Sequence, residues 1–371
     1  MLAKGQTVIQ QFERMVPKHL AMPDDRIGLQ LGTLQKDIRH VLIALDVTDE
    51  VVEEAIAAGT DLIIAHHAII FRPLTHLQTD TPAGRLYEKL IKHDIAVYIA
   101  HTNYDVAAHG MNDLMAEALG LTGTTFLEVV HTEKLKKLVV FVPKTHEEQV
   151  AKALFDAGAG HIGEYSHCSF RVEGTGTFLP GDRTQPFVGQ PGRLERAEEV
   201  RIETIVPDSI ERKAVQAMLK AHPYEEVAYD LYPLDLKGKA YGLGRVGKVA
   251  EPETLTQFAE RVKTAFDVPF VRVVGDPNRV VRKAAVLGGS GSRYVRHAQF
   301  AGADVLVSGD IDYHTAHDAL AAGIAVIDPG HNAEKIMKKS VAERLQSALN
   351  ADRYTTQVTP SQAHTEPFRL Q

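Results

Sequence analysis

The chain has almost no cysteine, and it lacks both a net positive charge and a long apolar run. Cys168 is the only cysteine among 371 residues, which excludes an intramolecular disulfide framework and a cysteine-rich zinc site. The formal net charge of −7 argues against general nucleic-acid binding. No segment approaches the roughly 20 apolar residues that cross a bilayer, and residues 1–20 lack a signal peptide's apolar core. We therefore expect a soluble, cytoplasmic protein, and we disfavour nucleic acid and membranes as its partners.

Length and composition indicate an ordinary globular protein of more than one domain. A chain of 371 residues is too long for one typical core, and its 44% hydrophobic and 24% charged residues give no sign of bulk disorder. With one cysteine, any metal site must be built from histidine, aspartate and glutamate. The 18 histidines supply enough imidazole for such a site.

The first and last thirds of the chain alternate short apolar runs with helical patterns. The expected strands span residues 40–46, 62–65, 95–100, 284–287, 304–308 and 324–328. Thr48 is a typical helix N-cap, and Asp49 and Glu50 favour the first turn of the helix that follows. Strands that alternate with helices imply βαβ units and a mainly parallel sheet.

The middle of the chain follows a different pattern. Its expected strands span residues 135–142, 200–206 and 227–233, and its expected helices span residues 147–157 and 209–221. Two rounds of strand, helix and strand predict a small α+β sandwich of the ferredoxin-like kind. We therefore predict an α/β fold in which a discontinuous parallel-sheet domain, residues 1–125 and 236–371, is interrupted by an inserted domain at 126–235.

An adjacent histidine pair, His66 and His67, ends the apolar run that begins at Asp61. The pair has two readings, a polar strand cap or a metal site, because each neutral imidazole offers one acceptor nitrogen. Asp105 and His331 also follow predicted parallel strands, and ligand sites in open α/β sheets are built at that edge. Glu334 is three residues after His331, so a helix there would place both on one face. These three imidazoles and two carboxylates suffice for two ions if one carboxylate bridges them.

Three further polar residues follow strands. We expect His101 either to orient Asp105 and transfer protons or to be a buried, hydrogen-bonded histidine. His314 is a candidate acid or base at the pocket wall, and we expect Asp310 to cap the helix that follows it.

Two other motifs have a structural and a functional interpretation. The glycine-rich Gly288–Ser292 loop is either a tight turn from strand to helix or an anion site, and it lacks the spacing of a P-loop or dinucleotide fingerprint. The segment His222–Glu226 is either a rigid turn or subunit contact, or a ligand site. We favour the structural interpretation of each.

Five segments together resemble the family of GTP cyclohydrolase 1 type 2 homologs, also described as dinuclear-metal-centre hexameric proteins. They are DDRIGLQLG (24–32), AHHAIIF (65–71), HTNYD (101–105), SGDIDYH (308–314) and DPGHNAE (328–334). The inserted segment with HPYEEVAYD (222–230) resembles the longer bacterial subgroup, whose insertion is similar to the PII and CutA type of ferredoxin-like protein. Ala68 replaces a common proline and Tyr104 a common leucine, and neither departure changes a ligand.

The resemblance implies a ligand set and an assembly. It makes His66, His67, Asp105, His331 and Glu334 the ligands of two divalent metal ions per subunit, zinc, iron or manganese, with Glu334 as the bridge. It also implies a toroidal homohexamer with the metal sites facing its interior.

We therefore expect a dinuclear-metal hydrolase that acts on a nucleotide or a related phosphorylated small molecule, with His101 or His314 moving protons. The alternative is a non-catalytic hexamer, a scaffold or regulator, in which metal or a small effector acts through the inserted domain.

Overall fold

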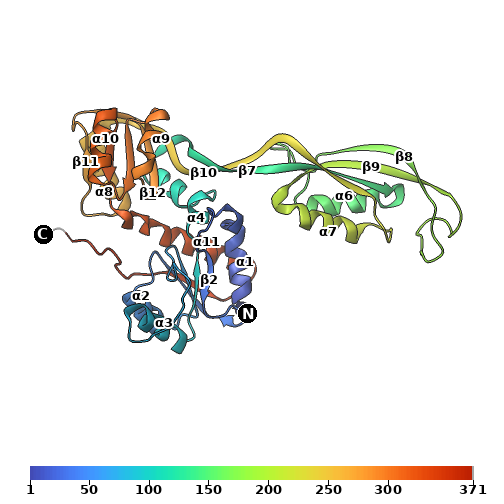
Figure 1. Cartoon of the computed structure of the whole chain (residues 1–371), viewed down its shortest axis with the longest axis horizontal. Coiled ribbons are helices and arrows are strands. Elements are labelled where there is room, and N and C mark those ends of the chain that lie inside the picture. The colour runs from blue at the N-terminus through green and yellow to red at the C-terminus, as the bar shows by residue number, and fades with distance from the viewer. Residues whose placement is uncertain (370–371) are drawn as a thin grey trace. The chain divides into compact units, whose positions relative to one another are not determined.

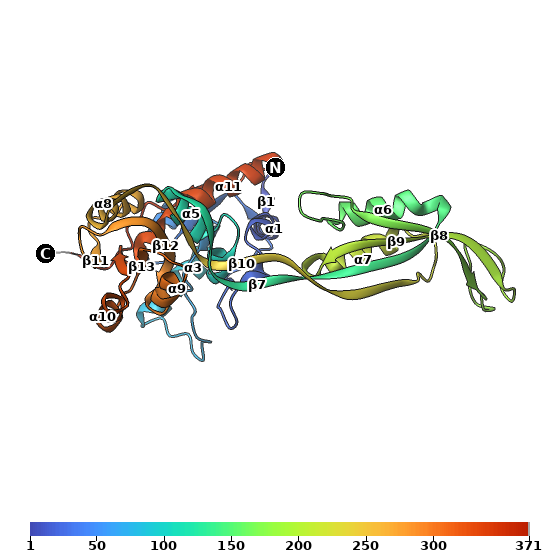
Figure 2. The same cartoon turned by 90° about the horizontal axis from the view of Figure 1, so that it is seen from above.

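The computed structural model describes residues 1–369, drawn from two directions in Figures 1 and 2. By their contacts, these residues form two compact units. One unit contains Met1–Val130 and the chain from Tyr241 onward, and the other is His131–Ala240. Two long strands, β7 (Leu121–Pro143) and β10 (Tyr229–Thr254), each contribute residues to both units.

The first unit contains a five-stranded sheet with a parallel centre. Its strands in spatial order are β15 (Gln357–Pro360), β4 (His40–Ala44), β5 (Leu62–Ala65), β6 (Ala96–Ile99) and β2 (Gly28–Leu31). Adjacent strands from β15 to β6 are parallel, and the edge strand β2 is antiparallel to β6. A short antiparallel pair, β1 (Ala3–Lys4) and β3 (Asp37–Ile38), lies outside this sheet.

Apolar residues on both faces of this sheet pack against helices. Along β4, Leu42 packs in one cluster with Val51 of α2 (Asp49–Ala57) and Leu90 of α3 (Pro82–Lys92). The alternate residues of β4 point to the other face, where Ile43 packs in a cluster with Phe12 of α1 (Gly5–Met15) and Leu345 of α11 (Met337–Ala351). Since both faces are covered, the strands are almost wholly apolar, as parallel strands in α/β proteins are.

A second sheet in the same unit also has a parallel core. Strand β12 (Val280–Ser290) pairs in parallel with β13 (Val305–Gly309), and β13 with β14 (Ala325–Asp328). The short strand β11 (Arg272–Val274) is antiparallel to β14, and β10 is antiparallel to β12. The remaining helices of this unit are α4 (Thr102–Val106), α5 (Met111–Ala118), α8 (Leu255–Phe266), α9 (Val295–Phe300) and α10 (Tyr313–Ala322). Among residues 1–369, no helix is long and apolar enough to cross a membrane.

The second unit has the predicted ferredoxin-like topology. Its chain order is β7, α6 (Glu147–Asp156), β8 (Ser169–Phe178), β9 (Glu195–Pro207), α7 (Glu211–Ala221) and β10. Its strands lie in the order β10-β7-β9-β8, with β9 antiparallel to both neighbours. Both helices pack on one face, where Val140, Ile202, Leu154 and Met218 share a buried core. The predicted fold class, α/β with an α+β insertion, is confirmed.

Candidate metal centre

The adjacent histidines of the first motif lie where β5 ends. The backbone N–H groups of His66 and His67 both donate to the carbonyl of Leu45, at 3.2 and 3.0 Å, so the chain turns against the end of β4. The turn removes the strand alternation that would send the two side chains to opposite faces. Their imidazole centroids are only 5.0 Å apart. Asp105 reaches the same place from α4, after the end of β6.

The third motif approaches from the second sheet. His331 and Glu334 lie in a 3-10 helix, His331–Ile336, that follows β14. A 3-10 helix has about three residues per turn, so residues three apart are eclipsed. His331 Nε2 and Glu334 Oε2 are 3.3 Å apart as a result. The expectation that both side chains share one face is met by this tighter helix instead of an α-helix.

The carboxylate of Glu334 lies between two groups of possible ligands. Its Oε1 is 3.7 Å from His66 Nε2, which is itself 3.6 Å from Asp105 Oδ1. Its Oε2 is 3.2 Å from His67 Nε2 and 3.3 Å from His331 Nε2. We call the first group the inner subsite (His66, Asp105, Glu334) and the second the outer subsite (His67, His331, Glu334). In each, the ligand atoms all lie within 4.8 Å of one another.

The other ring nitrogen of each histidine is held by an oxygen acceptor. His66 Nδ1 lies 2.9 Å from the carbonyl of Ala100, and His67 Nδ1 lies 2.7 Å from Asp46 Oδ1. His331 Nδ1 lies 2.7 Å from Asp310 Oδ2. Because these oxygens only accept, each Nδ1 carries the proton, and each Nε2 presents a lone pair to the centre when the ring is neutral. In metal-binding proteins, a hydrogen bond of this kind from the other ring nitrogen typically orients each histidine ligand.

Several atoms that face the centre make no hydrogen bond to the protein. Four of them are buried without a hydrogen bond among the described residues: His66 Nε2, His67 Nε2, Asp105 Oδ1 and Glu334 Oε2. Buried polar atoms left unpaired cost free energy, so native proteins rarely retain them unless water or an ion completes the site. Imidazole nitrogens and carboxylate oxygens around one point fit a borderline divalent cation. The residues therefore fit the metal that the sequence resemblance implies.

The pKa directions show that the centre favours positive charge. Burial opposes protonation of His67, but the Asp46 and Glu334 carboxylates outweigh it and raise the pKa of His67 to about 10. The Glu334 carboxylate is the largest influence on His331 and raises its pKa to about 9 against the opposing effect of burial. Burial raises the pKa of Asp105 to about 6. Burial also acts to raise the pKa of Glu334, but the surrounding histidines hold it well below its usual range. The negative charge of the buried carboxylates can be neutralised either by protons on the histidines or by bound metal ions.

His101 lies beside the inner subsite. One ring nitrogen of His101 lies within 4.8 Å of a ring nitrogen of His66 and of one of His67. His101 Nδ1 lies 2.9 Å from Asp25 Oδ1, and Thr102 N–H donates to Asp25 Oδ2 at 2.9 Å. Burial raises the pKa of Asp25, but these bonds outweigh it and keep the pKa well below its usual range. His101 is therefore oriented in the same way as the other three histidines.

The structure does not bring His314 into this cluster. His314 is exposed, and its ring packs on Tyr313, with centroids 5.6 Å apart. It belongs to none of the metal-compatible groups among residues 1–369. A catalytic role for His314 stays a prediction.

Asp310 does not cap a helix, which corrects the sequence-based interpretation. The N-cap of α10 is Asp312, whose Oδ1 accepts from the N–H groups of His314 and Thr315 at 3.0 Å each. Asp310 instead has a left-handed backbone with φ of 55° and binds His331. Two aspartates two residues apart both follow the strand, and the local pattern did not distinguish them.

Asp25 and Asp46 are partners of site histidines that were not predicted from the sequence. Asp46 was assigned only to the end of a strand, and Asp25 was noted only within the family segment 24–32. A usable signal exists for Asp46, since it follows β4 at the same sheet edge as His66 and His67.

The glycine-rich loop leaves space for the Glu334 carboxylate. Strand β12 continues to Ser290 and a 3-10 helix begins at Ser292, so the strand-to-helix turn predicted for Gly288–Ser292 is present but is confined to Gly291. A Cβ atom at Gly288 would lie 2.8 Å from Glu334 Oε1, and one at Gly289 would lie 3.3 Å from it. Glycine lets the backbone approach the carboxylate closely.

A cavity of about 780 Å³ opens beside the outer subsite. His67, His331 and Asp310 line it, together with Phe270 and Phe368. The C-terminal segment forms part of its wall, and Thr365 Oγ1 donates to Asp46 Oδ2 at 2.7 Å. The outer subsite therefore borders a space large enough for a small molecule.

Comparison with known proteins shows which family this chain resembles. The sequence profile of Duf34/NIF3 (NGG1p interacting factor 3) matches residues 3–367. A Halalkalibacterium halodurans protein named GTP cyclohydrolase 1 type 2 homolog is 56% identical over 367 residues, 99% of each chain. A Bacillus subtilis protein of the same name is 54% identical over 364 residues, 98% of each chain. These names confirm the resemblance found in the sequence.

A solved structure agrees with these matches. The crystal structure of a Bacillus cereus protein related to NIF3 has a TM-score of 0.94, 56% identity and full coverage of both chains. The similarity includes the inserted unit as well as the strands that carry the histidines. The chain therefore belongs to the Duf34/NIF3 family.

Proposed function

We propose that this protein binds two divalent metal ions and uses them to hydrolyse a nucleotide or a related phosphorylated compound. The observation that carries the proposal is the position of Glu334. Its two oxygens face different ligand groups, at 3.7 Å from His66 on one side and at 3.2 and 3.3 Å from His67 and His331 on the other. A carboxylate in this position can be shared by two ions.

Each ligand has an assigned role in this proposal. His66, Asp105 and Glu334 would hold the inner ion, while His67, His331 and Glu334 would hold the outer one. Bound zinc, iron or manganese would supply Lewis acidity and an acidified water. Asp25 keeps the Nδ1 proton of His101 in place, which leaves Nε2 to accept a proton beside the centre. Asp46 and Asp310 fix the rings of the outer subsite.

The cavity beside the outer subsite supports an aromatic, anionic substrate. Phe270 and Phe368 can contact a planar base, and Arg369 and Arg272 place guanidinium groups on the same lining. Arg272 is paired with Asp328, so Arg369 is the better candidate for a phosphate. The name of the relatives, GTP cyclohydrolase 1 type 2 homolog, makes GTP the first compound to assay.

Metal content and turnover measured on the same samples test the proposal. The isolated protein is expected to hold two ions per chain by elemental analysis and to hydrolyse one compound in a panel of nucleotides and phosphoesters. Glu334→Ala and His67→Ala should lose metal and turnover while circular dichroism shows an intact fold. Glu343→Ala, an exposed change on α11, serves as the control. Full turnover by a demonstrably metal-free Glu334→Ala protein would refute the hydrolytic mechanism.

We also propose that the chain assembles as a homohexamer, as the resemblance implies. Large apolar side chains are exposed in the isolated chain, including Phe300 at 88% and Phe71 at 69%. Burial of such side chains between subunits would remove their apolar area from water. Light scattering on the full chain tests this proposal, and a monomer at micromolar concentration would contradict it.

A further inference from the structure

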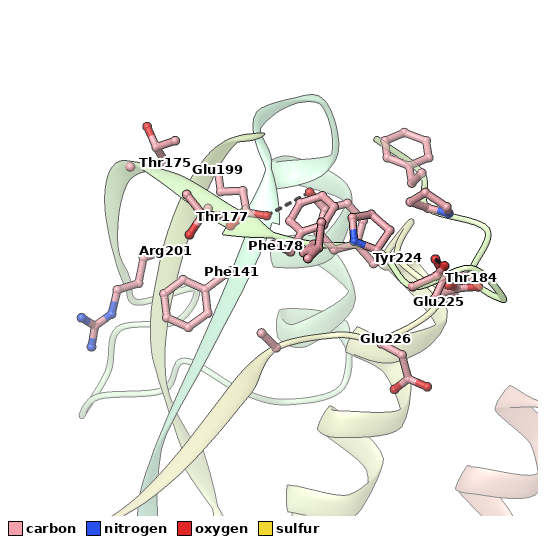
Figure 3. A pocket seen from close by; sticks show the side chains of 18 of the residues that line it. Phe141, Thr175, Thr177, Phe178, Thr184, Glu199, Arg201, Tyr224, Glu225 and Glu226 are labelled. Atoms are coloured by element: carbon pink, nitrogen blue, oxygen red, sulfur yellow. Dashed lines mark hydrogen bonds between the residues drawn. The ribbon is translucent and has the colours of Figure 1, made fainter. Parts of the chain in front are cut away.

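The inserted unit contains a cavity of its own, with a volume of about 600 Å³. Figure 3 shows its side chains, which come from β7, β8, β9 and the segments after β8 and α7. Glu199 and Arg201 are two residues apart on β9, so they point to the same face of the sheet. Their neighbours Val200 and Ile202 pack with the helices, so the cavity lies on the other face.

Aromatic rings form much of the wall. Tyr224 lies among them, with its ring centroid 6.0 Å from that of Phe178 and 6.2 Å from that of Phe187. Phe141 contributes a further ring on the sheet, but the Arg201 guanidinium lies 6.0 Å from its centroid, so Tyr224, Phe178 and Phe187 are the rings open to a ligand. A hydrogen bond holds the segment that carries Phe187 against the segment after α7, since Gln185 N–H donates to Glu225 Oε1 at 3.1 Å. The wall is therefore formed before any ligand binds, which lowers the entropic cost of binding.

A buried carboxylate faces this cavity. Glu199 is only 8% exposed, and its Oε1 accepts a hydrogen bond of 2.9 Å from the Tyr224 hydroxyl, drawn as a dashed line in Figure 3. In the described part of the chain, no group hydrogen-bonds its Oε2. A Cβ atom at position 176 would lie 2.1 Å from Oε2, so Gly176 leaves the space that this oxygen occupies.

The charges of the lining are not balanced. Two charged groups of the lining have partners outside it. Arg201 pairs with Glu203 at 2.9 Å, and Glu173 pairs with Lys144 at 2.8 Å. The lining carboxylates of Glu199, Glu225 and Glu226 have no ion-pair partner among residues 1–369. The cavity therefore combines aromatic faces with uncompensated negative charge.

We propose that this cavity binds a small organic cation, an ammonium, amidinium or guanidinium group on an aromatic or apolar body. The aromatic faces attract the cation through their quadrupoles, and Glu199 Oε2 accepts its N–H group. The sequence alone favoured a rigid turn or subunit contact for His222–Glu226, yet Tyr224, Glu225 and Glu226 all line the cavity. The site is separate in sequence and chemistry from the metal centre.

Three probes of one shape and different charge test the proposal. Benzamidine is cationic, benzamide neutral and benzoate anionic, and each is titrated calorimetrically into the full, metal-free chain. Benzamidine is expected to bind at least about tenfold more tightly than the other two, since a hydrogen bond to a charged group outweighs a neutral one by about that factor.

Variants of the lining test whether benzamidine binds in this cavity. Glu199→Gln keeps the size of the side chain and its bond from Tyr224 but removes the charge, and it should weaken benzamidine binding about tenfold. Glu198→Gln removes an exposed neighbouring charge and should change nothing. Phe187→Ala alters a half-exposed ring and gives a second test if Glu199→Gln folds poorly.

Three results would overturn the proposal. One is equal affinity of the three probes. The second is benzamidine binding that is unchanged in both Glu199→Gln and Phe187→Ala. The third is the absence of benzamidine binding into the millimolar range in the unaltered chain.

Discussion

The hydrogen bond from His67 to Asp46 allows one metal ion to be weakened without touching any ligand. Asp46 Oδ1 lies 2.7 Å from His67 Nδ1, and Asp46 Oδ2 accepts from Thr365 at 2.7 Å. Asp46→Asn keeps the shape of the side chain. Its amide oxygen can still accept from His67 while its nitrogen faces the Thr365 hydroxyl, so only the charge is lost.

The size of the effect follows from that charge. A hydrogen bond to a charged group contributes about 1.5–3 kcal/mol and a neutral one about 0.5–1.5 kcal/mol. Substitution of an outer partner of a metal-bound histidine typically reduces affinity about 10- to 100-fold. The Asp46 side chain is 32% exposed, so solvent screens its charge and the lower end applies. We expect a loss of about tenfold, or about 1.4 kcal/mol.

Stepwise zinc titration against a chromophoric chelator measures this loss. Only the outer ion should weaken, because His67 belongs to the outer subsite while His66 is oriented by the Ala100 carbonyl. Asp310→Asn should weaken the same ion through His331, and Glu53→Gln, an exposed change, should weaken neither. If Asp46→Asn affects both ions alike, or neither, the assignment of His67 to a separate subsite is wrong.

Three further predictions concern the neighbourhood of the centre and the fold. Gly288→Ala should weaken both ions in the same titration, since its Cβ would lie 2.8 Å from the shared carboxylate, and unchanged affinity would contradict this. Asp312→Ala should lower the free energy of unfolding by about 1 kcal/mol through loss of the α10 cap and leave zinc affinity unchanged. His40 is buried between the hydroxyls of Thr60 and Thr359, and burial lowers its pKa from 6.5, although Asp61 and Glu54 oppose this. Its stabilising contribution is then complete above pH 6.5 and is lost as the pH falls through the lower folded value. Urea unfolding of the metal-free chain should therefore show less acid sensitivity in His40→Asn than in the unaltered chain, and equal sensitivity would count against the inference.

Local pattern predicted the parts of the fold that depend on short apolar runs. Strand β5 has the predicted bounds, and Thr48 caps α2 as expected, its hydroxyl accepting from Val51 N–H. Strands β7 and β10 are far longer than the predicted 135–142 and 227–233. Their additional residues mix polar residues and glycine with apolar ones, even where β10 is buried at 242–247, so hydrophobic pattern did not extend the strands.

Topology explains part of the convergence on the centre. His66, His67 and Asp105 follow neighbouring parallel strands of one sheet, whose ends meet at one edge. His331 follows β14 of the other sheet, so its approach to the same centre depends on how the two sheets pack, which strand order does not predict. Asp25 and Asp310, which orient two of the rings, were not predictable from local pattern, because their contacts join segments that are far apart in the sequence. Asp25 is 76 residues from His101, and Asp310 is 21 residues from His331. The bond between Glu199 and Tyr224, 25 residues apart, was hidden for the same reason.

The unequal depth of the two subsites has a kinetic consequence. The His66 side chain is 1% exposed, whereas the His331 side chain is 40% exposed and borders a cavity. An ion in the inner position should therefore exchange with the medium far more slowly than its outer neighbour. Freshly isolated protein would then keep, in its inner position, the metal acquired during synthesis, while the outer position equilibrates with each buffer. Isotopically labelled zinc added after purification should enter one position in minutes and the other only on prolonged incubation.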